Sequence, residues 1–197
     1  PEYIPIDDNH PKDPINPYGK SKLMVEEILK DFEYAYGLKY VSFRYFNAAG
    51  HDPDGELSER HDLETHLLPI LMQAANGQRE SVSIFGNDYD TKDGTCVRDY
   101  IHVNDLANAH LKGLDFLNQN ELSSAEFNLG NGTGFSVREV IQRVIDITGK
   151  DIKVLEEGRR DGDPSTLIAS DDKARKILGL EASFSSLEKI IETLVVK

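Results

Sequence analysis

The chain has 197 residues, of which 39% are hydrophobic and 29% charged, and its 35 acidic and 22 basic side chains give a formal net charge of −13. This composition is typical of one large or two small globular domains, and its acidity argues against a surface for nucleic acid or anionic membranes. No apolar stretch approaches the roughly 20 residues that span a bilayer, and the single cysteine, Cys96, excludes an internal disulfide framework and favours a reducing cytoplasm.

The first half of the chain contains a strong helix signal. The proline-rich opening, residues 1–16, fits an arm of a native domain or a loop within a longer chain. Asn16 as cap and Pro17 at the first helical position predict a helix over residues 18–36, which Gly37 ends. Its apolar face is predicted at Leu23, Ile28, Leu29, Phe32 and Ala35. The elements that follow are a strand over 39–46, a turn-rich stretch over 47–62, a helix from about Leu67 or Pro69 to just before Gly77, a strand over 82–85 and a polar loop over 86–94.

The second half alternates more regularly between strands and helices. Two of its helices carry a predicted capping box, formed by Ser136 with Glu139 and by Ser185 with Glu188. The alternation predicts an α/β fold with a largely parallel sheet. The predicted elements are a strand over 97–103, a helix capped by Asn104 and running to about 117, a strand over 126–129, a helix over 136–148 that Gly149 ends, a strand over 152–155, and helices over 172–178 and 186–196.

A glycine loop over residues 130–134 (GNGTG) follows a predicted strand and opens a helix, which is the setting of a dinucleotide-binding loop. Its spacing is G-x-G-x-G rather than G-x-G-x-x-G, and the carboxylate that ends the next strand, Glu156, lies 26 residues beyond Gly130 rather than about 20. We therefore interpret the loop as a strand-to-helix turn that needs a positive φ.

Tyr18 and Lys22 lie four residues apart on the first predicted helix and so share a face. An ammonium group beside a tyrosine stabilises the phenolate, which lets the pair move a proton to or from a hydroxyl or carbonyl oxygen. The spacing alone favours the alternative of a solvated lysine beside a half-buried ring.

Residues 17–22 (PYGKSK) and 44–50 (RYFNAAG) resemble the extended short-chain dehydrogenase/reductase family. Within it, residues 85–95 (FGNDYDTKDGT) and 97–106 (VRDYIHVNDL) are similar to the UDP-glucose 4-epimerases, and residues 128–132 and 159–164 add to this similarity. The resemblance covers the chain from about residue 14 to residue 180.

The resemblance implies the C-terminal part of an NAD-binding Rossmann fold plus a smaller mixed α/β substrate-binding domain. Residues 1–46 would end the Rossmann domain and carry the catalytic helix. Residues 47–197 would form mainly the UDP-sugar-binding domain, with residues 97–106 and 126–148 returning to the Rossmann sheet. The family's G-x-x-G-x-x-G turn and its catalytic serine or threonine would lie upstream, so we expect negligible activity from residues 1–197 alone.

The implied activity is the interconversion of UDP-galactose and UDP-glucose through transient oxidation at the sugar C4, with NAD as the cofactor. Tyr18 would be the acid/base on the 4-hydroxyl, and Lys22 would tune it while bonding the nicotinamide ribose. The intact enzyme would be a cytoplasmic homodimer with a UDP-hexose substrate and no nucleic-acid or membrane partner.

The resemblance also implies which residues would bind cofactor and substrate. Tyr45 and Phe46 would lie beside the nicotinamide, where a strand of an open α/β sheet ends. Arg98 and Arg160 would clamp the diphosphate and Asp163 would accept a ribose hydroxyl, while Leu167 would border the sugar without deciding between hexoses and N-acetylhexosamines. The remaining implied substrate-binding residues are Asn47, His66, Leu67, Ser83, Ile84, Phe85 and Tyr100.

Three alternatives stay open. One is a sibling nucleotide-sugar dehydratase, decarboxylase or reductase with the same tyrosine and lysine, and another is a non-catalytic UDP-sugar-binding module. The third is an alternative to the diphosphate-binding role of the two arginines. Arg98 could form a surface ion pair with Asp99, and residues 159–161 could form a solvated loop. We predict no metal site, because the other histidines, including His51, His61, His102 and His110, lack ligand-like spacing.

Overall fold

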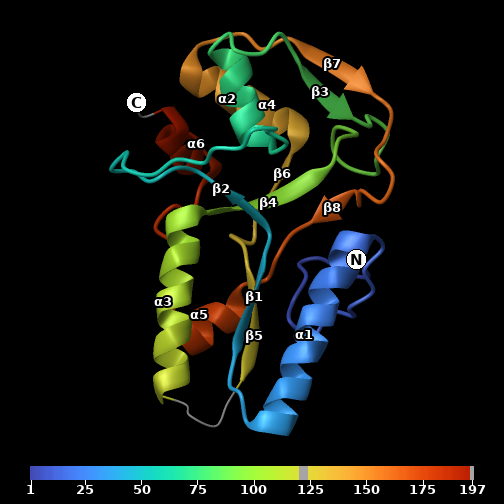
Figure 1. Ribbon diagram of the computed structural model, residues 1–197. Helices are drawn as coiled ribbons and strands as arrows, with labels where there is room; N and C mark the ends of the chain where they lie inside the picture. The colour runs from blue at the N-terminus through green and yellow to red at the C-terminus, as the bar shows by residue number, and fades with distance from the viewer. Residues whose placement is uncertain (120–123, 196–197) are drawn as a thin grey trace.

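The computed structural model describes residues 1–119 and 124–195 and shows an α/β protein with two hydrophobic cores (Figure 1). The lower body in Figure 1 contains a parallel strand pair, in which Val41 is opposite Ala125 and Tyr45 is opposite Leu129. A helix stands on each side of this pair. The elements of this body are α1 (Pro17–Tyr36), β1 (Val41–Tyr45), α3 (Val103–Gln119), β5 (Ala125–Leu129) and α5 (Asp172–Leu178).

The upper body has a second parallel strand pair, β3 (Val82–Phe85) with β7 (Val154–Glu157), beside three packed helices. The helices are α2 (Leu67–Ala75), α4 (Val137–Thr148) and α6 (Leu187–Val195). The predicted α/β fold class with parallel strands is therefore confirmed.

A small sheet centred on β4 (Val97–His102) lies between the two bodies. Adjacent side chains of a strand point to opposite faces, and β4 uses both, because Tyr100 packs in the upper core and Ile101 in the lower one. The partners of β4 are β2 (Asn47–Ala49), β6 (Gly134–Ser136) and β8 (Thr166–Leu167).

The chain passes from one body to the other between β1 and β2. Phe46 lies between these strands, and its backbone N–H donates to the carbonyl of Leu129 at 3.0 Å. Asn47 then pairs with Tyr100 in the small sheet. Consecutive residues thus bring the carboxyl end of the lower strand pair to the small sheet.

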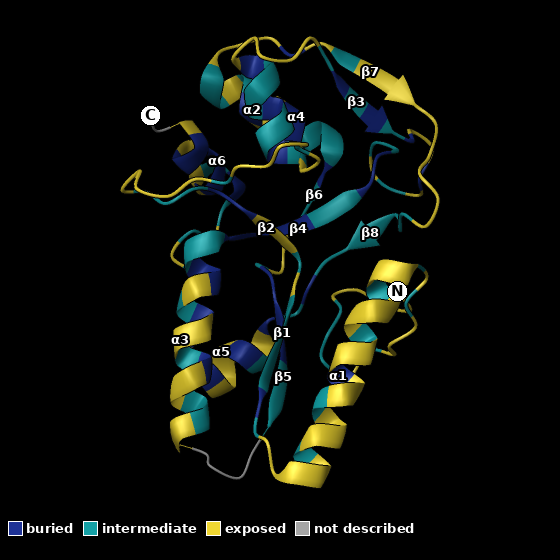
Figure 2. Ribbon diagram, viewed as in Figure 1, coloured by how far each residue is buried: buried dark blue, intermediate teal, exposed yellow. Residues whose placement is uncertain are grey.

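Helix α1 begins and ends as the sequence predicts. The Asn16 side chain accepts a hydrogen bond from the Gly19 N–H at 2.8 Å, and Gly37 ends the helix with a φ of 70°. The predicted apolar face is wrong in part, because Ile28 and Phe32 are 53% and 48% exposed. The side facing the strands carries a buried charge instead, and Figure 2 shows that most of the helix surface is exposed.

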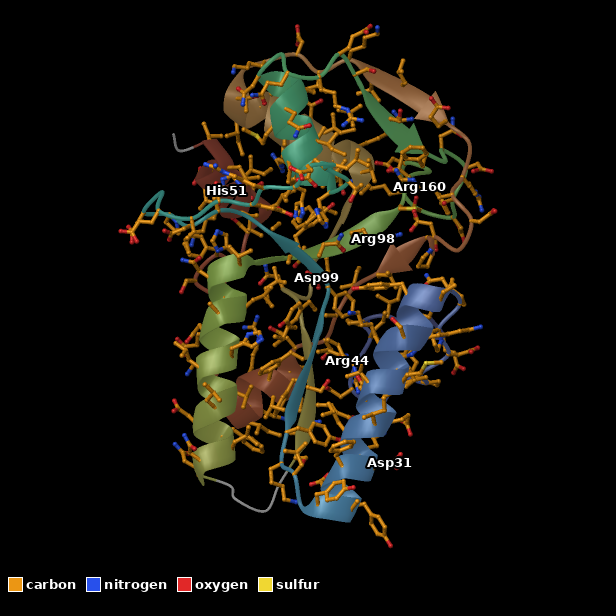
Figure 3. All side chains as sticks on the ribbon, viewed as in Figure 1. Asp31, Arg44, His51, Arg98, Asp99 and Arg160 are labelled. Atoms are coloured by element: carbon orange, nitrogen blue, oxygen red, sulfur yellow. The ribbon has the colours of Figure 1, made fainter. Side chains whose placement is uncertain are left out.

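That buried charge is Glu26, which is held by Arg44 of β1. The Arg44 Nε and Nη2 atoms lie 2.5 and 2.9 Å from the two Glu26 carboxylate oxygens, and Nη2 is also 3.0 Å from Glu126 (Figure 3). Lys12 approaches Glu26 to 2.7 Å. Buried charges are retained only when they are paired, so this network fastens α1 to the strand pair.

Three other predictions need correction. The short strand β2 falls in the segment predicted as turn-rich, β6 overlaps the glycine loop and the predicted start of the next helix, and no element was predicted at β8. Helix α3 begins at Val103, so Asn104 lies inside it and donates its N–H to the His102 ring rather than capping. The cap of α6 is Ser186, not Ser185, because the Ser186 hydroxyl accepts from the Lys189 N–H at 3.3 Å. The predicted end of this helix at residue 196 lies outside the described residues.

Candidate active site

A cavity of about 1340 Å³ lies between the two bodies and collects residues from most of the chain. It contains thirteen of the fifteen site residues that the sequence and its resemblance indicated. Two do not line it: Lys22, whose ammonium lies over the Tyr18 ring, and Ile84, whose side chain is buried in the upper core with 2% exposure. The thirteen are Tyr18, Tyr45, Phe46, Asn47, His66, Leu67, Ser83, Phe85, Arg98, Tyr100, Arg160, Asp163 and Leu167.

Tyr18 and Lys22 meet on the first turns of α1, as their spacing predicts. The Lys22 Nζ lies 5.0 Å from the centroid of the Tyr18 ring, within reach of a cation–π interaction. Tyr18 borders the cavity and is 72% exposed, so its hydroxyl is open to a ligand.

Tyr45 is oriented by a histidine that sequence reasoning did not select. Its hydroxyl lies 2.7 Å from Nε2 of His110, whose Nδ1 lies 2.7 Å from the Leu106 carbonyl oxygen. We assign the imidazole proton to Nδ1, because the carbonyl only accepts, and Nε2 then accepts from the tyrosine. Burial raises the pKa of Tyr45, so this hydroxyl stays a donor at neutral pH. No local motif indicates this contact, since the two residues are 65 positions apart.

Arg98 and Asp163 form an ion pair across the cavity wall. The Arg98 Nη2 contacts the Asp163 carboxylate, while Nη1 donates to the carbonyl of Val97 at 2.7 Å. The Arg98 side chain is 12% exposed. The alternative of a surface pair with Asp99 is therefore wrong, because the partner of Arg98 is Asp163.

The two adjacent arginines of residues 159–161 have different surroundings. Arg159 binds Asp88, with its Nε 2.6 Å from the carboxylate. The Arg160 guanidinium instead lies over the Phe85 ring, 3.6 Å from its centroid, and its side chain lines the cavity. Among the residues that the structure describes, Arg160 forms no ion pair with a carboxylate. Residues 157–162 are exposed, so the alternative of a solvated loop stays open, but the Arg160 charge borders the cavity and is available to an anion there.

Asp99 lies beneath the cavity wall with no exposed surface (Figure 3). It accepts hydrogen bonds from the backbone N–H groups of Asn131, Gly132 and Ala169 at 2.9 to 3.1 Å. Two N–H groups of the glycine loop therefore donate to an internal carboxylate and are not available to bind a phosphate. The interpretation as a turn is confirmed at Gly132, where φ is 71°.

Burial raises the pKa of Asp99 from 3.8 to about 6, against the pull of its three N–H donors. A pKa that is higher in the folded state stabilises the fold fully below about pH 4, and the contribution disappears as the pH rises through 6. We expect the unfolding free energy of the wild type, relative to Asp99→Asn, to fall by about 2 kcal/mol between pH 4 and 7. Urea unfolding of both proteins across this range measures it, and parallel pH profiles would contradict the assignment.

A family model described as the NAD dependent epimerase/dehydratase family matches residues 1–130. The chain belongs to this family. The match includes Tyr18, Lys22, Arg98 and the chain passage at Phe46, and it ends where the glycine loop begins.

Relatives within this epimerase/dehydratase family agree with the sequence resemblance. A UDP-glucose 4-epimerase of Streptococcus mutans is 53% identical over 191 residues, which are 97% of this chain and 57% of that protein. The crystal structure of UDP-glucose 4-epimerase from Brucella ovis in complex with NAD has a TM-score of 0.91 at 46% identity and covers 97% of this chain and 58% of that one. The Bifidobacterium longum enzyme in complex with NAD+ and UDP has a TM-score of 0.93 at 37% identity, covering 98% and 58%.

The chain therefore spans somewhat more than half the length of the family members it matches. Within the residues that the structure describes, no helix is both long and apolar enough to cross a membrane.

Proposed function

We propose that this chain supplies the UDP-sugar-binding part and the catalytic tyrosine of a UDP-glucose 4-epimerase. The observation that carries the proposal is the convergence of Tyr18 with two arginines, Arg98 and Arg160, on one cavity. Tyr18 can exchange a proton with a reacting hydroxyl, and the two arginines can bind a diphosphate. Together they match a substrate that contains both groups. In this proposal residues 1–46 complete an NAD-binding domain. Residues 47–197 form mainly the sugar-nucleotide domain, with residues 97–106 and 126–148 contributing to the nucleotide-binding sheet.

In the proposed reaction, Tyr18 accepts the proton of the sugar 4-hydroxyl and later returns it to the 4-keto oxygen. The Lys22 ammonium lies 5.0 Å from the centroid of the Tyr18 ring, within reach of a cation–π interaction that holds the two side chains together. NAD, when bound, supplies the transient oxidation and reduction at C4. The residues present fit the nicotinamide, because Tyr45 ends β1 at the cavity, Phe46 follows it there, and His110 already satisfies the Tyr45 hydroxyl.

The proposed UDP end of the cavity is the region of Arg98, Arg160 and Phe85. Guanidinium groups match phosphate oxygens in charge and geometry, and the aromatic ring offers a surface for uracil. Asp163 would accept a hydrogen bond from a ribose hydroxyl. The Arg98 guanidinium would bind both the Asp163 carboxylate and the diphosphate. The backbone of Ser83 and Ile84 would border the base, and the sugar would lie among Asn47, His66, Leu67, Tyr100 and Leu167.

A chimera tests the activity. Residues 1–197 replace the matched region of the Streptococcus mutans relative, and the product formed from UDP-galactose is identified by NMR and mass. We expect UDP-glucose of unchanged mass with no net consumption of NAD. Loss of water or net redox would indicate a sibling enzyme, and UDP binding without turnover would indicate a binding module. Residues 1–197 alone, with NAD added, are expected to show negligible turnover.

Arg160→Ala is expected to weaken UDP binding by about 10- to 100-fold, because hydrogen bonds to charged groups contribute roughly 1.5–3 kcal/mol. Arg159→Ala is the matched control, since the neighbouring guanidinium binds Asp88 and does not line the cavity. Calorimetric titration with UDP compares the two variants. Equal losses of affinity would show that the charge of the loop, not the position of Arg160, determines binding.

The proposal extends to the assembly and location of the intact enzyme, as a cytoplasmic homodimer. The exposed apolar side chains Met24, Val25 and Ile28 of α1 support a partner surface on this helix, and the single cysteine supports a reducing compartment. Sedimentation of the chimera would measure its oligomeric state.

A further inference from the structure

The loop between β2 and α2 gathers four side chains of the kinds that bind metal ions. Two are imidazoles and two are carboxylates, and one ligand atom from each lies within 4.8 Å of all the others. The four, here called the Glu/His cluster, are Glu59, His61, Glu64 and His66. Their positions in the sequence predicted no metal site, because the loop brings them together by a fold that spacing does not reveal.

Both imidazoles of the cluster contact one carboxylate oxygen of Glu59. Glu59 Oε1 lies 2.8 Å from Nε2 of His61 and 3.0 Å from Nδ1 of His66. The same Nδ1 lies 2.9 Å from Glu64 Oε1. A neutral imidazole nitrogen that carries a proton satisfies only one of two such oxygens well, whereas a cation between the groups binds all of them at once. Donor atoms around a tetrahedral Zn²⁺ are about 3.4 Å apart. The four ligand atoms of the cluster already lie within 4.8 Å of one another, so small side-chain rotations would bring them to this spacing.

Among the residues that the structure describes, the two carboxylates of the cluster have ion-pair partners only in its own two imidazoles. Neither Glu59 nor Glu64 forms an ion pair with lysine or arginine in the described parts of the chain. The Glu64 side chain is only 6% exposed, and its Oε1 accepts from the backbone N–H groups of Thr65 and His66. Two carboxylates held together in a protein of net charge −13 favour a divalent cation over an empty cluster.

The cluster also has access to solvent and to the candidate active site. Glu59 and Glu64 line both the large cavity and a second one of about 340 Å³, so they lie in the wall between the two. His66 lines the large cavity and His61 the small one. A cation therefore has an entry path through the smaller cavity.

We propose that the Glu/His cluster is a Zn²⁺ site that fixes the loop forming one wall of the large cavity. Two imidazole nitrogens select zinc over magnesium or calcium, which prefer oxygen donors alone. Binding through Nδ1 would leave Nε2 of His66 as the protonated nitrogen. The ion would thus give this ring a single tautomer, with one N–H available to a ligand in the cavity.

Zinc binding to residues 1–197, after removal of metal with a chelator, tests the site directly and does not depend on enzymatic activity. Competition with a chromophoric chelator measures stoichiometry and affinity, and zinc-edge X-ray absorption reports the number of imidazole ligands. We expect one Zn²⁺ per chain with a Kd of about 1 µM or tighter, two imidazole ligands, and no displacement by millimolar Mg²⁺.

His61→Ala and Glu59→Gln are expected to weaken this binding by at least tenfold. Both positions are partly exposed, so the substitutions spare the cores, and circular dichroism checks the fold. The controls are Glu56→Gln, a carboxylate of the same loop outside the cluster, and His10→Ala, an imidazole elsewhere; both should keep the wild-type affinity. Absence of stoichiometric zinc, or equal affinity in His61→Ala, would overturn the proposal.

Discussion

Tyr18→Phe is expected to lower the kcat for UDP-galactose by about 10²–10⁴-fold in the chimera, because it removes the group that carries the proton. The substitution keeps the ring beside the Lys22 ammonium, so substrate binding should change little. Since Tyr18 is 72% exposed, the fold should not be affected either. Steady-state kinetics over a range of UDP-galactose concentrations separates kcat from KM.

The matched control is Tyr34→Phe on the same helix. Tyr34 is 94% exposed and does not line the cavity, so its hydroxyl has no expected part in turnover. If Tyr18→Phe retained activity within about threefold of the wild type, another group would have to carry the proton, and the proposed role of Tyr18 would be wrong.

Arg44→Ala is expected to reduce the free energy of unfolding by about 3–5 kcal/mol, the usual cost of leaving a buried charge without its partner. Arg44 binds Glu26 through two nitrogens and Glu126 through one, and Glu26 is only 7% exposed. Without the guanidinium, the one charged partner that Glu26 keeps among the described residues is Lys12. Urea unfolding of residues 1–197 measures the difference.

An exposed ion pair supplies the comparison. Arg143 lies 3.0 Å from Glu188, with side chains 50% and 40% exposed, and pairs of this kind contribute about 0–1 kcal/mol. Arg143→Ala should therefore have little effect on unfolding. Similar losses in both variants would mean that burial of Glu26 does not determine the importance of Arg44.

Local chemistry predicted the helices well and the short strands poorly. The cap at Asn16, the stop at Gly37 and the capping box of Ser136 with Glu139 depend on neighbouring residues, and all three are confirmed. Strands of two or three residues, such as β8, are defined by their distant pairing partners and leave no periodic pattern.

In the candidate site, sequence motifs predicted individual residues but not the contacts between residues that are distant in the sequence. The family motifs indicated thirteen of the residues that line the cavity, but not which side chains pair with each other there. The hydrogen bond of Tyr45 to His110 and the pairing of Arg98 with Asp163 join positions 65 residues apart in each case. The Glu/His cluster shows the same limitation over a short distance, because the path of an irregular loop determines which side chains meet.

The two faces of β4 have a thermodynamic consequence. Tyr100 belongs to the upper core and Ile101 to the lower one, although they are consecutive residues. Neither core can lose its packing without freeing a strand on which the other depends. The two bodies should therefore unfold as one cooperative unit, with a single transition seen by probes in either core.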